Sequence, residues 1–514
     1  MRIGDLDLPA QVLSGPSRAE LCAVDAATWR AVADAVTDAG GSLVALWAAD
    51  ERDRHGGFLV HAAYDLCGPM LCAVLELDAA APAYPDLAYR FPAAGRMQRA
   101  AFDLLGVKPL GAADERPWLR HAGWAPGVHP LRRDVPPGDR LAQADDSYAF
   151  VSVAGEGVHE IPVGPVHAGT IEPGHFRFSI IGERVLRLEE RLGYKHKGVE
   201  KAFEGLGVAQ GARLAGRVSG DSTVAYAWAY AMAVESVAGV DISPRAAWLR
   251  AYALERERVG NHLGDLGFIG NDAGLGFALA QFSRLREDWL RVDQAVFGHR
   301  LVMDFIVPGG VASDFDEAFE RELRHQARAI EHEVTRLRAL FADHEGLQDR
   351  LRRCGVVTPE LARRLGLTGL AGRASGVARD LRLDAPVMPY DRIAPRLATR
   401  TDGDVAARVA VRFDEILESL QVLQRLLDTL PPPEPLRVSL PEAATGFGIG
   451  RVEGWRGEVL VAVELEAGRV RRAHPHDPSW QNWPVLEHAI LGNIVPDFPL
   501  INKSFNLSYA GVDL

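Results

Sequence analysis

Apolar residues in the first third of the chain follow two different spacings, which together predict a mixture of helices and strands. Residues 19–39 have the three- and four-residue spacing of a helix and end at Gly40-Gly41, a helix-stop signal. Residues 57–66 and 70–77 have the pattern of strands, and Cys67-Gly68-Pro69 between them indicates a hairpin connection. The front of the chain is therefore predicted to be mixed α/β.

A loop-rich segment separates this front portion from the rest of the chain. A further helix is expected at residues 93–105. Residues 117–138 follow it and end in Pro136-Pro137-Gly138, which breaks regular structure. We place the domain boundary near residue 145, which divides the chain into domains 1–145 and 146–514.

Behind that boundary the chain is mostly helical. Short strands are expected at residues 150–153 and 176–188, and apolar residues at three- and four-residue spacing predict long helices further on. These helices cover residues 223–240, 244–271, 277–297, 315–347 and 405–430. Strand-like alternation returns at 457–465, and an irregular tail is expected from there to Leu514. The predicted fold class is α+β: a small α/β N-terminal domain, then a large, mostly helical domain with a small antiparallel sheet.

Charge and cysteine content exclude several classes of protein. The 514 residues carry 57 Lys and Arg against 69 Asp and Glu, a net charge of -12, which disfavours a general nucleic-acid binder. The four scattered cysteines have neither zinc nor cluster spacing and indicate a reducing, cytosolic setting. The longest apolar run, residues 224–234, is about half a membrane span and predicts a buried core helix.

Four segments contain more Gly, His, Arg and aromatic residues than packing requires: residues 164–176, 191–201, 217–222 and 504–511. The first is either a plain hairpin or a glycine-rich loop that presents His167 to a cavity. Glu200, in the second, is either a helix-start partner, an ion-pair partner of Arg217 or another arginine, or a buried proton carrier. Asp221 and Ser222, in the third, are candidates for a helix N-cap.

Searches for nucleotide and metal motifs fail. No Gly-x-Gly-x-x-Gly in the setting of a dinucleotide fold and no phosphate-binding Gly-Lys-Ser/Thr loop occurs. Residues 446–450 look superficially nucleotide-like, but they are expected neither to follow a strand nor to open a helix. His474 and His476 are two weak potential metal ligands, and a polar surface turn is the favoured interpretation.

The segments named above, in this order, resemble the large subunit of membrane-bound [NiFe] hydrogenases and the 49-kDa subunit of respiratory complex I. The matching residues are 164–167, 191–201, 217–218, 229–235, 255–263, 373–376, 390–392 and 448–457. The front portion is similar to the complex I 30-kDa subunit through residues 102–107 and 129–134. Fusion of the two most resembles the group 4, formate hydrogenlyase type of large subunit.

The chain departs from this family at the metal site. Hydrogenase large subunits hold nickel and iron through two Cys-x-x-Cys pairs, and here these positions are Ser219 and Ser222, and Ser508 and Gly511. Soft thiolates hold such a centre, and serine hydroxyls do not replace them. Nickel and an active [NiFe] hydrogenase are therefore not expected, and this chain is expected to bind no metal or cofactor itself.

The resemblance to complex I implies a quinone cavity in place of the metal. His167 matches the histidine that serves the quinone head group, whereas the corresponding tyrosine position falls on Gly220. Tyr226 and Tyr509 on flanking motifs are possible substitutes. Glu200 matches the glutamate that passes protons beside the nickel in hydrogenases. The expected catalytic residues are Glu200 and His167, and the expected cavity residues are His167, Ser219, Gly220, Asp221, Ser222, Tyr226, Ser508 and Tyr509.

The resemblance implies a nickel-free electron- and proton-coupling subunit of a complex I-like, NADH:quinone oxidoreductase-like or hydrogenase-like complex. Its expected partners are an Fe–S small subunit with a [4Fe-4S] cluster, membrane antiporter-like subunits and a quinone. These partners would hold it on the inner face of the cell membrane. The alternative is a non-catalytic scaffold that docks the Fe–S subunit to the antiporter-like subunits. The set of neighbouring genes would discriminate between the two.

Overall fold

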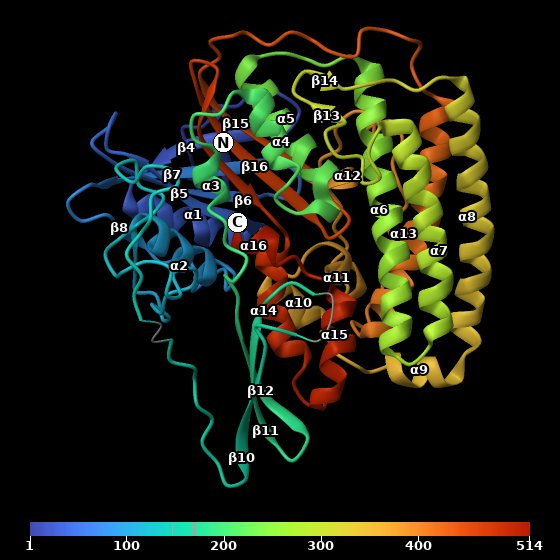
Figure 1. The fold of residues 1–514 in the computed structure, drawn as a ribbon. Coiled ribbons are helices and arrows are strands. Elements are labelled where there is room, and N and C mark those ends of the chain that lie inside the picture. Colours follow the sequence, from blue (N-terminus) through green and yellow to red (C-terminus); the bar gives the residue numbers. More distant parts are fainter. Residues whose placement is uncertain (146–147, 168–170) are drawn as a thin grey trace.

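A five-stranded sheet forms the N-terminal part of the molecule (Figure 1). The computed structural model describes residues 1–145, 148–167 and 171–514. The strand order is β3-β4-β7-β6-β5, and each neighbouring pair is antiparallel except β4 and β7. The strands are β3 (Gln11–Val12), β4 (Ala19–Val24), β5 (Ser42–Glu51), β6 (Gly57–Asp65) and β7 (Met70–Asp78). The helices α1 (Ala26–Asp38) and α2 (Ala94–Leu105) pack against this sheet.

The hairpin and the second helix of this region are confirmed, but the first helix was predicted too long. Residues 19–24 form β4, which pairs with β7 in parallel register, and α1 begins only after Asp25. The Asp25 carboxylate accepts the backbone N–H of Thr28 at 2.8 Å and caps the helix. Pairing with a strand about 50 residues away decided the conformation of residues 19–24 against their helical spacing.

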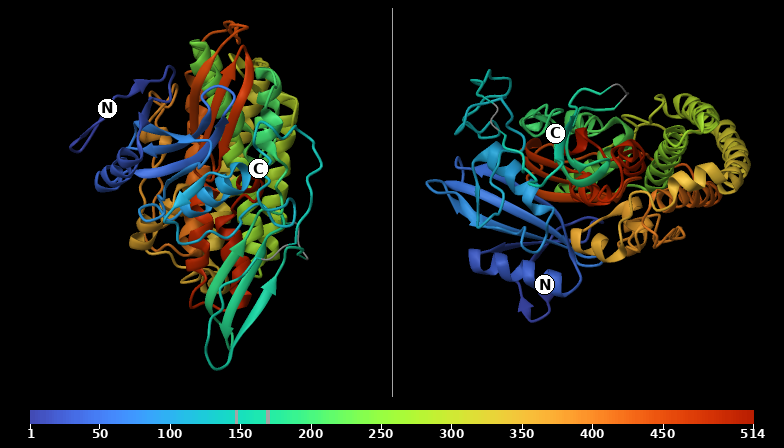
Figure 2. Two further views of the ribbon diagram at one scale, coloured as in Figure 1. Left: turned by 90° about the vertical axis from the view of Figure 1, so that its left-hand side faces the viewer. Right: turned by 90° about the horizontal axis from the view of Figure 1, so that it is seen from below.

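A second, three-stranded sheet lies between the N-terminal sheet and a buried helix (Figure 2). Its strands β15 (Gly446–Glu453), β16 (Glu458–Glu466) and β17 (Arg469–His476) form an antiparallel meander. Helix α5 (Thr223–Ala238) packs against β15 and β16. Trp47 and Met70 of the first sheet share one apolar cluster with Leu460 and Ala462 of the second. The two sheets are therefore joined by a common core.

The predicted irregular tail is wrong, because residues after 466 are mostly regular. After β17 the chain forms helices α14 (Ser479–Ala489), α15 (Phe498–Phe505) and α16 (Ala510–Asp513). Its aromatic residues are packing residues: Trp480 and Trp483 are buried and Phe505 is 3% exposed. Proline did not prevent this, because Pro484 lies inside α14 and Pro499 in the first turn of α15.

The glycines of residues 446–450 let α5 approach the sheet. They lie in strand β15, so this segment neither follows a strand nor opens a helix, as expected for a sequence that is not a phosphate loop. A Cβ atom at Gly448 would overlap the carbonyl oxygen of Ala233, and one at Gly450 that of Ala229. Successive alternate residues of a strand face the same side, so both glycines lie under the same helix. The pattern therefore serves close backbone packing.

Long helices form the far side of the molecule (Figure 1). They are α6 (Pro244–Asp272), α7 (Gly276–Phe297), α8 (Glu317–Asp343) and α13 (Val405–Asp428). Pro244 begins α6 after the cap Ser243, at the residue where the predicted helix 244–271 starts. The helix expected at 315–347 is interrupted at His344, where α9 (Glu345–Leu351) begins. Three short helices connect to α13: α10 (Pro359–Leu365), α11 (Gly369–Ala374) and α12 (Leu381–Asp384).

Buried ion pairs connect these helices to the three-stranded sheet of β15, β16 and β17, the central sheet. Arg373 donates to Glu415 of α13 at 2.8 Å and to Glu453 of β15 at 2.7 Å. Glu255 of α6 accepts hydrogen bonds from Arg382 at 2.9 Å and from the Tyr390 hydroxyl at 2.7 Å. Glu255, Arg373 and Tyr390 come from the family-matching segments 255–263, 373–376 and 390–392. These three residues of the resemblance therefore take part in buried ion pairs and hydrogen bonds.

A narrow sheet projects away from the body (Figure 1). It consists of β10 (Val158–Val163), β11 (His175–Ile181) and β12 (Arg184–Arg191). The strand expected at 150–153 is absent, whereas 176–188 covers most of β11 and β12. Residues 168–169 of the predicted glycine-rich loop lie outside the described residues. The chain then enters the body through α3 (Val199–Phe203) and α4 (Val208–Ala215).

The remaining strands form two-residue or three-residue pairs: β1 (Arg2–Ile3) with β2 (Leu6–Asp7), β8 (Ala83–Pro85) with β9 (Lys108–Leu110), and β13 (Ile306–Val307) with β14 (Gly310–Val311).

Among the described residues, no helix has enough consecutive apolar positions to span a bilayer. Helix α5, the longest apolar stretch of the sequence, is instead buried from Thr223 to Ser236. The prediction of a core helix at 224–234 is confirmed.

We predict that Gly450→Ala lowers the free energy of unfolding by about 3 kcal/mol, because the added methyl group forces α5 away from β15. Gly276→Ala is the matched control, since a Cβ there meets no atom within 4 Å. Thermal unfolding followed by circular dichroism measures both variants. Equal melting temperatures for Gly450→Ala and the wild type would contradict this role of the glycine.

Candidate functional site

A cavity of about 340 Å³ opens where the loop before α5 meets the C-terminal tail. Five of the predicted cavity residues line it: Ser219, Gly220, Asp221, Ser508 and Tyr509. The two segments that supply them are 289 positions apart in the sequence, counted from Ser219 to Ser508. The structure therefore brings the two segments that were expected to share a site to the same cavity.

Two serine hydroxyls meet at the wall of this cavity. Ser219 Oγ lies 3.0 Å from Ser508 Oγ and donates to Asp221 Oδ1 at 2.7 Å. The backbone N–H of Gly511 donates to Ser508 Oγ at 2.9 Å. Because Ser219 gives its proton to Asp221, Ser508 supplies the proton of the bond between the two serines. The result is a directed row of hydrogen bonds from Gly511 to the Asp221 carboxylate.

Arg456 places a fixed positive charge beside this row. Its guanidinium donates to both carboxylate oxygens of Asp221, at 3.1 and 2.5 Å, and to Ser222 Oγ at 3.3 Å. Burial alone would raise the pKa of Asp221, but the charge and hydrogen bonds of Arg456 hold it below its usual value. Ser222 contacts Arg456 through this hydrogen bond and is not part of the cavity lining.

The donor set does not suit a nickel–iron centre. Of the four positions that carry thiolates in hydrogenases, three provide hydroxyl groups and Gly511 provides no side chain. A Cβ atom at Gly511 would lie 2.6 Å from Asp477 Oδ2, so Asp477 occupies the space of a side chain there. In the described part of the chain, no three His, Cys, Asp or Glu residues gather in a metal-binding arrangement. The chemistry of this cavity is therefore that of its hydroxyl, carboxylate and cationic groups.

His167 lies outside the cavity lining. It donates from Nε2 to the carbonyl oxygen of Gly174 at 2.9 Å, within its own hairpin. A Cβ at Gly174 would lie 2.6 Å from the ring of Tyr509, so Gly174 separates His167 from the cavity wall. Tyr509 itself packs edge-on against Trp483, with ring centroids 4.8 Å apart.

Tyr226 also lies behind the cavity. It is fully buried in α5, and its hydroxyl donates to Asp477 Oδ2 at 2.9 Å. Asp477 in turn lies beside Gly511. Tyr226 therefore supports the turn that presents Ser508, and does not reach the open space.

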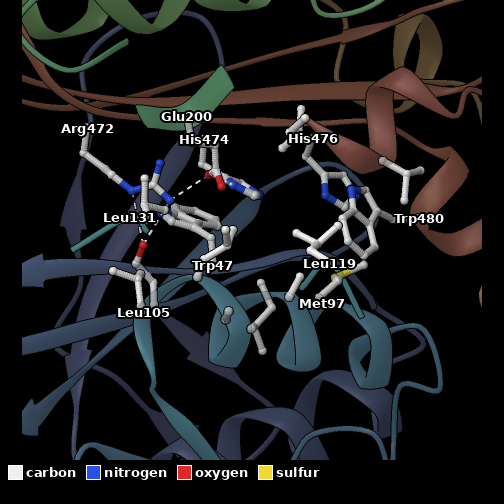
Figure 3. A pocket seen from close by; sticks show the side chains of 17 residues that line it. Trp47, Met97, Leu105, Leu119, Leu131, Glu200, Arg472, His474, His476 and Trp480 are labelled. Carbon is white, nitrogen blue, oxygen red and sulfur yellow. Dashed lines mark hydrogen bonds and ion pairs between the residues drawn. The ribbon is translucent and has the colours of Figure 1, made fainter. Parts of the chain in front are cut away.

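Glu200 lines a different and much smaller pocket of about 30 Å³ (Figure 3). Its Oε1 accepts from Arg472 at 2.7 Å and lies 2.7 Å from His474 Nδ1. Burial would raise the pKa of Glu200, but the positive charge of Arg472 and the contact with His474 lower it to about 2. Glu200 therefore pairs with an arginine, as one interpretation expected. The partner is not Arg217, which pairs with Asp304 at 2.7 Å.

A row of stacked rings extends from this pocket between the two sheets. Trp47 stacks on His61 at 4.9 Å and on His474 at 5.0 Å, and His476 follows His474 at 6.1 Å. His474 and His476 lie in β17, 7% and 1% exposed, so their interpretation as a surface turn is wrong. The signal for burial was their spacing of two, which places both on one face of a strand.

Sequence reasoning also missed Arg456, Lys197 and Lys503 as cavity residues. All three are part of the lining. Arg456 falls within residues 448–457, so the family resemblance was the available signal. Lys197 falls within residues 191–201, one of the four segments singled out from the sequence, whereas Lys503 lies just before residues 504–511. Both join the cavity because the tail folds back onto residues 193–198.

We predict that Glu200→Gln lowers the free energy of unfolding by about 3 kcal/mol, because it leaves the charge of Arg472 buried without its partner. Glu183→Gln, on an exposed turn, is the control and leaves stability unchanged. Denaturant unfolding measures the effect. A variant of normal stability with slowed proton-linked turnover would instead identify Glu200 as a relay.

We predict that acid destabilises the protein below pH 6.5 partly through His61. Burial lowers its pKa from 6.5 to about 3. The unfolded chain therefore binds a proton that the folded chain does not, and stability falls as pH falls from 6.5 towards 3. His61→Phe should reduce the slope between pH 6 and 4 by about 1.4 kcal/mol per pH unit, measured by denaturant titration. An unchanged slope, or an equal change in the exposed control His55→Gln, would contradict this assignment.

Comparisons with known proteins agree with this architecture. The family of the respiratory-chain NADH dehydrogenase 49 Kd subunit matches residues 272–446, and that of the 30 Kd subunit matches residues 22–140. Formate hydrogenlyase subunit 5 of Escherichia coli (strain K12) is 30% identical over 483 residues, 92% of this chain and 85% of the relative. Hydrogenase-4 component G of the same organism is 32% identical over 92% of this chain and 84% of its own length.

Two further relatives extend the range of the similarity. The C/D subunit of an NADH-quinone oxidoreductase of Bacteroides thetaiotaomicron is 28% identical over 82% of this chain and 84% of the relative. A chain from the structure of the membrane-bound sulfane sulfur reductase, an archaeal respiratory membrane complex, superposes with a TM-score of 0.66 and 26% identity. That match covers 70% of this chain and 99% of the other. The chain therefore belongs to the family of group 4 hydrogenase large subunits and complex I 49-kDa subunits, with a 30-kDa-type domain in the same polypeptide.

Proposed function

We propose that this chain reduces a quinone or a similar small acceptor, without nickel, as one subunit of a membrane-associated oxidoreductase complex. The observation that carries the proposal is the 340 Å³ cavity at Ser219 and Ser508. Hydrogenase members of the family carry metal-binding thiolates at the positions that match these serines, whereas here the positions border an open polar cavity. Reduction of a quinone to a quinol there requires two electrons and two protons.

The electrons would come from a [4Fe-4S] cluster in a partner subunit, because this chain has no cluster-type cysteine spacing of its own. Relatives named as a formate hydrogenlyase subunit and an NADH-quinone oxidoreductase subunit support a multi-subunit complex. The similarity to a chain of an archaeal respiratory membrane complex supports membrane subunits as further partners, and we expect these to be antiporter-like. These would hold the chain on the inner face of the cell membrane.

The protons would reach the acceptor through groups at the cavity wall. The hydroxyl row Ser508–Ser219 ends on Asp221 and can pass a proton by exchanging donor and acceptor roles. A route through Glu200 would have to use His474, whose Nδ1 is its neighbour in the separate pocket. Glu200→Gln tests the second of these routes.

A non-catalytic scaffold is the second candidate, and one observation favours it. The polar atoms expected to serve an acceptor already have partners within the chain: His167 with Gly174, Tyr226 with Asp477, and Asp221 with Arg456. In this alternative the cavity is inert and the chain docks the Fe–S subunit to the membrane subunits.

Gly220→Leu separates the two candidates. A Cβ at Gly220 meets no atom within 4 Å, so a leucine there occupies open space at the cavity lining without displacing the fold. We predict that the variant assembles normally but loses at least about tenfold in quinone turnover of the purified complex, as expected when the acceptor site is blocked. Gly276→Leu, also in open space, is the control. Normal turnover in Gly220→Leu would reject the acceptor site and leave the scaffold.

A further inference from the structure

The lining of the cavity carries an excess of positive charge, although the chain as a whole has a net charge of -12. Its cations are Lys197, Arg217, Arg456 and Lys503, and its carboxylates are Glu172 and Asp221. A lining with two more cations than carboxylates creates a local potential opposite in sign to the net charge of the protein. This inversion is the first observation that points to the charge of the ligand.

Two of the four cations are already neutralised by fixed partners. Arg456 forms its bidentate pair with Asp221, and Arg217 donates from both terminal nitrogens to Asp304, each at 2.7 Å. Such two-pronged guanidinium–carboxylate pairs hold their geometry well. The excess charge of the cavity therefore resides on its two lysines.

Within the part of the chain that the structure describes, neither lysine forms an ion pair with a carboxylate. The Lys503 ammonium lies 4.8 Å from the centre of the Phe268 ring, and its charge acts against the rise that burial causes in the pKa of Asp272. Burial lowers the pKa of Lys197, and the neighbouring Lys195 adds to the effect. Glu172, the carboxylate beside them, is engaged by Lys195 at 3.6 Å and by the backbone N–H of Ala510 at 3.1 Å. Both ammonium groups are therefore available to a ligand.

The rest of the lining offers hydroxyl groups and few apolar side chains. Ser219 and Ser508 supply the hydroxyl groups, and the aliphatic contributions come from Ile171, Val218, Leu507 and Ala510. An uncharged isoprenoid quinone is matched by a predominantly apolar pocket, whereas a small anion is matched by ammonium and hydroxyl donors. The composition of the wall thus agrees with the charge of the lysines.

We propose that this cavity binds a small anionic molecule, bearing a sulfonate, phosphate or carboxylate group, between Lys503 and Lys197. The proposal deepens the proposed function, since it names the chemical class of the acceptor that the cavity takes. Lys503 and Lys197 are the charge-recognising residues, and the serine pair contacts the body of the ligand. Binding requires no turnover and is measured by itself.

The test compares a charged and an uncharged form of one probe. Isothermal titration calorimetry on the purified chain with naphthoquinone sulfonate and with its uncharged parent, naphthoquinone, gives both dissociation constants. We expect the sulfonate to bind at least about tenfold more tightly at low salt and to weaken as ionic strength rises, because salt screens exposed charges. Equal affinities, tighter binding of the parent, or no binding of the sulfonate would overturn the proposal.

Charge-removing variants locate the site. Lys503→Gln, and Lys197→Gln together with it, should weaken sulfonate binding by about fivefold to tenfold per ammonium and leave the parent quinone unaffected. Lys108→Gln is the control, since Lys108 is an exposed lysine that pairs with Glu115 far from the cavity. Unchanged affinity in Lys503→Gln, or an equal loss in Lys108→Gln, would place the anion elsewhere and overturn the assignment.

The outcome also separates this inference from the proposed function. Tight, lysine-dependent binding of the sulfonate, combined with no reduction of it by the assembled complex, would support the anion site and reject the acceptor role. Reduction of the uncharged quinone with no preference for the sulfonate would support the acceptor role and reject the anion site.

Discussion

The docking of the last seven residues onto the body holds this molecule's site together. The Asp513 carboxylate accepts the backbone N–H groups of Gly193 and Lys195, each at 2.8 Å, and the carbonyl of Leu514 accepts that of Lys197 at 2.8 Å. These bonds place Ser508 against Ser219 on one side. On the other side they place Val512 and Leu514 in the pocket of Glu200. One short segment therefore forms a wall of both cavities.

The polar groups that line the larger cavity are paired with one another within the chain. Here Arg456 and Asp221 form an internal pair, and serine hydroxyls bond to each other. Buried polar groups must be paired, and these groups form a network in which each has a partner. The two lysines of the lining carry the positive charge that is left over.

The central sheet joins the two parts of the chain through its two faces. One face receives α5 at close range over Gly448 and Gly450, and the other contributes Leu460 and Ala462 to a core shared with the N-terminal sheet. The stacked row of His61, Trp47 and His474 lies in the same interface. Neutral histidines suit this position because burial disfavours their charged form.

The sequence by itself determined the elements whose signals are local. No distant partner was needed for the helix at 405–430, for the hairpin around Gly68 or for the start of α6 at Pro244. The absence of the four cysteines of the Cys-x-x-Cys pairs was read directly from the sequence. Tertiary structure alone decided that residues 19–24 pair as a strand and that Glu200 pairs with Arg472. It also decided that helix α5 packs directly on Gly448 and Gly450, and which predicted residues share the cavity. Each of these outcomes depends on a contact between segments far apart in the chain, and neither spacing nor propensity encodes which surfaces meet.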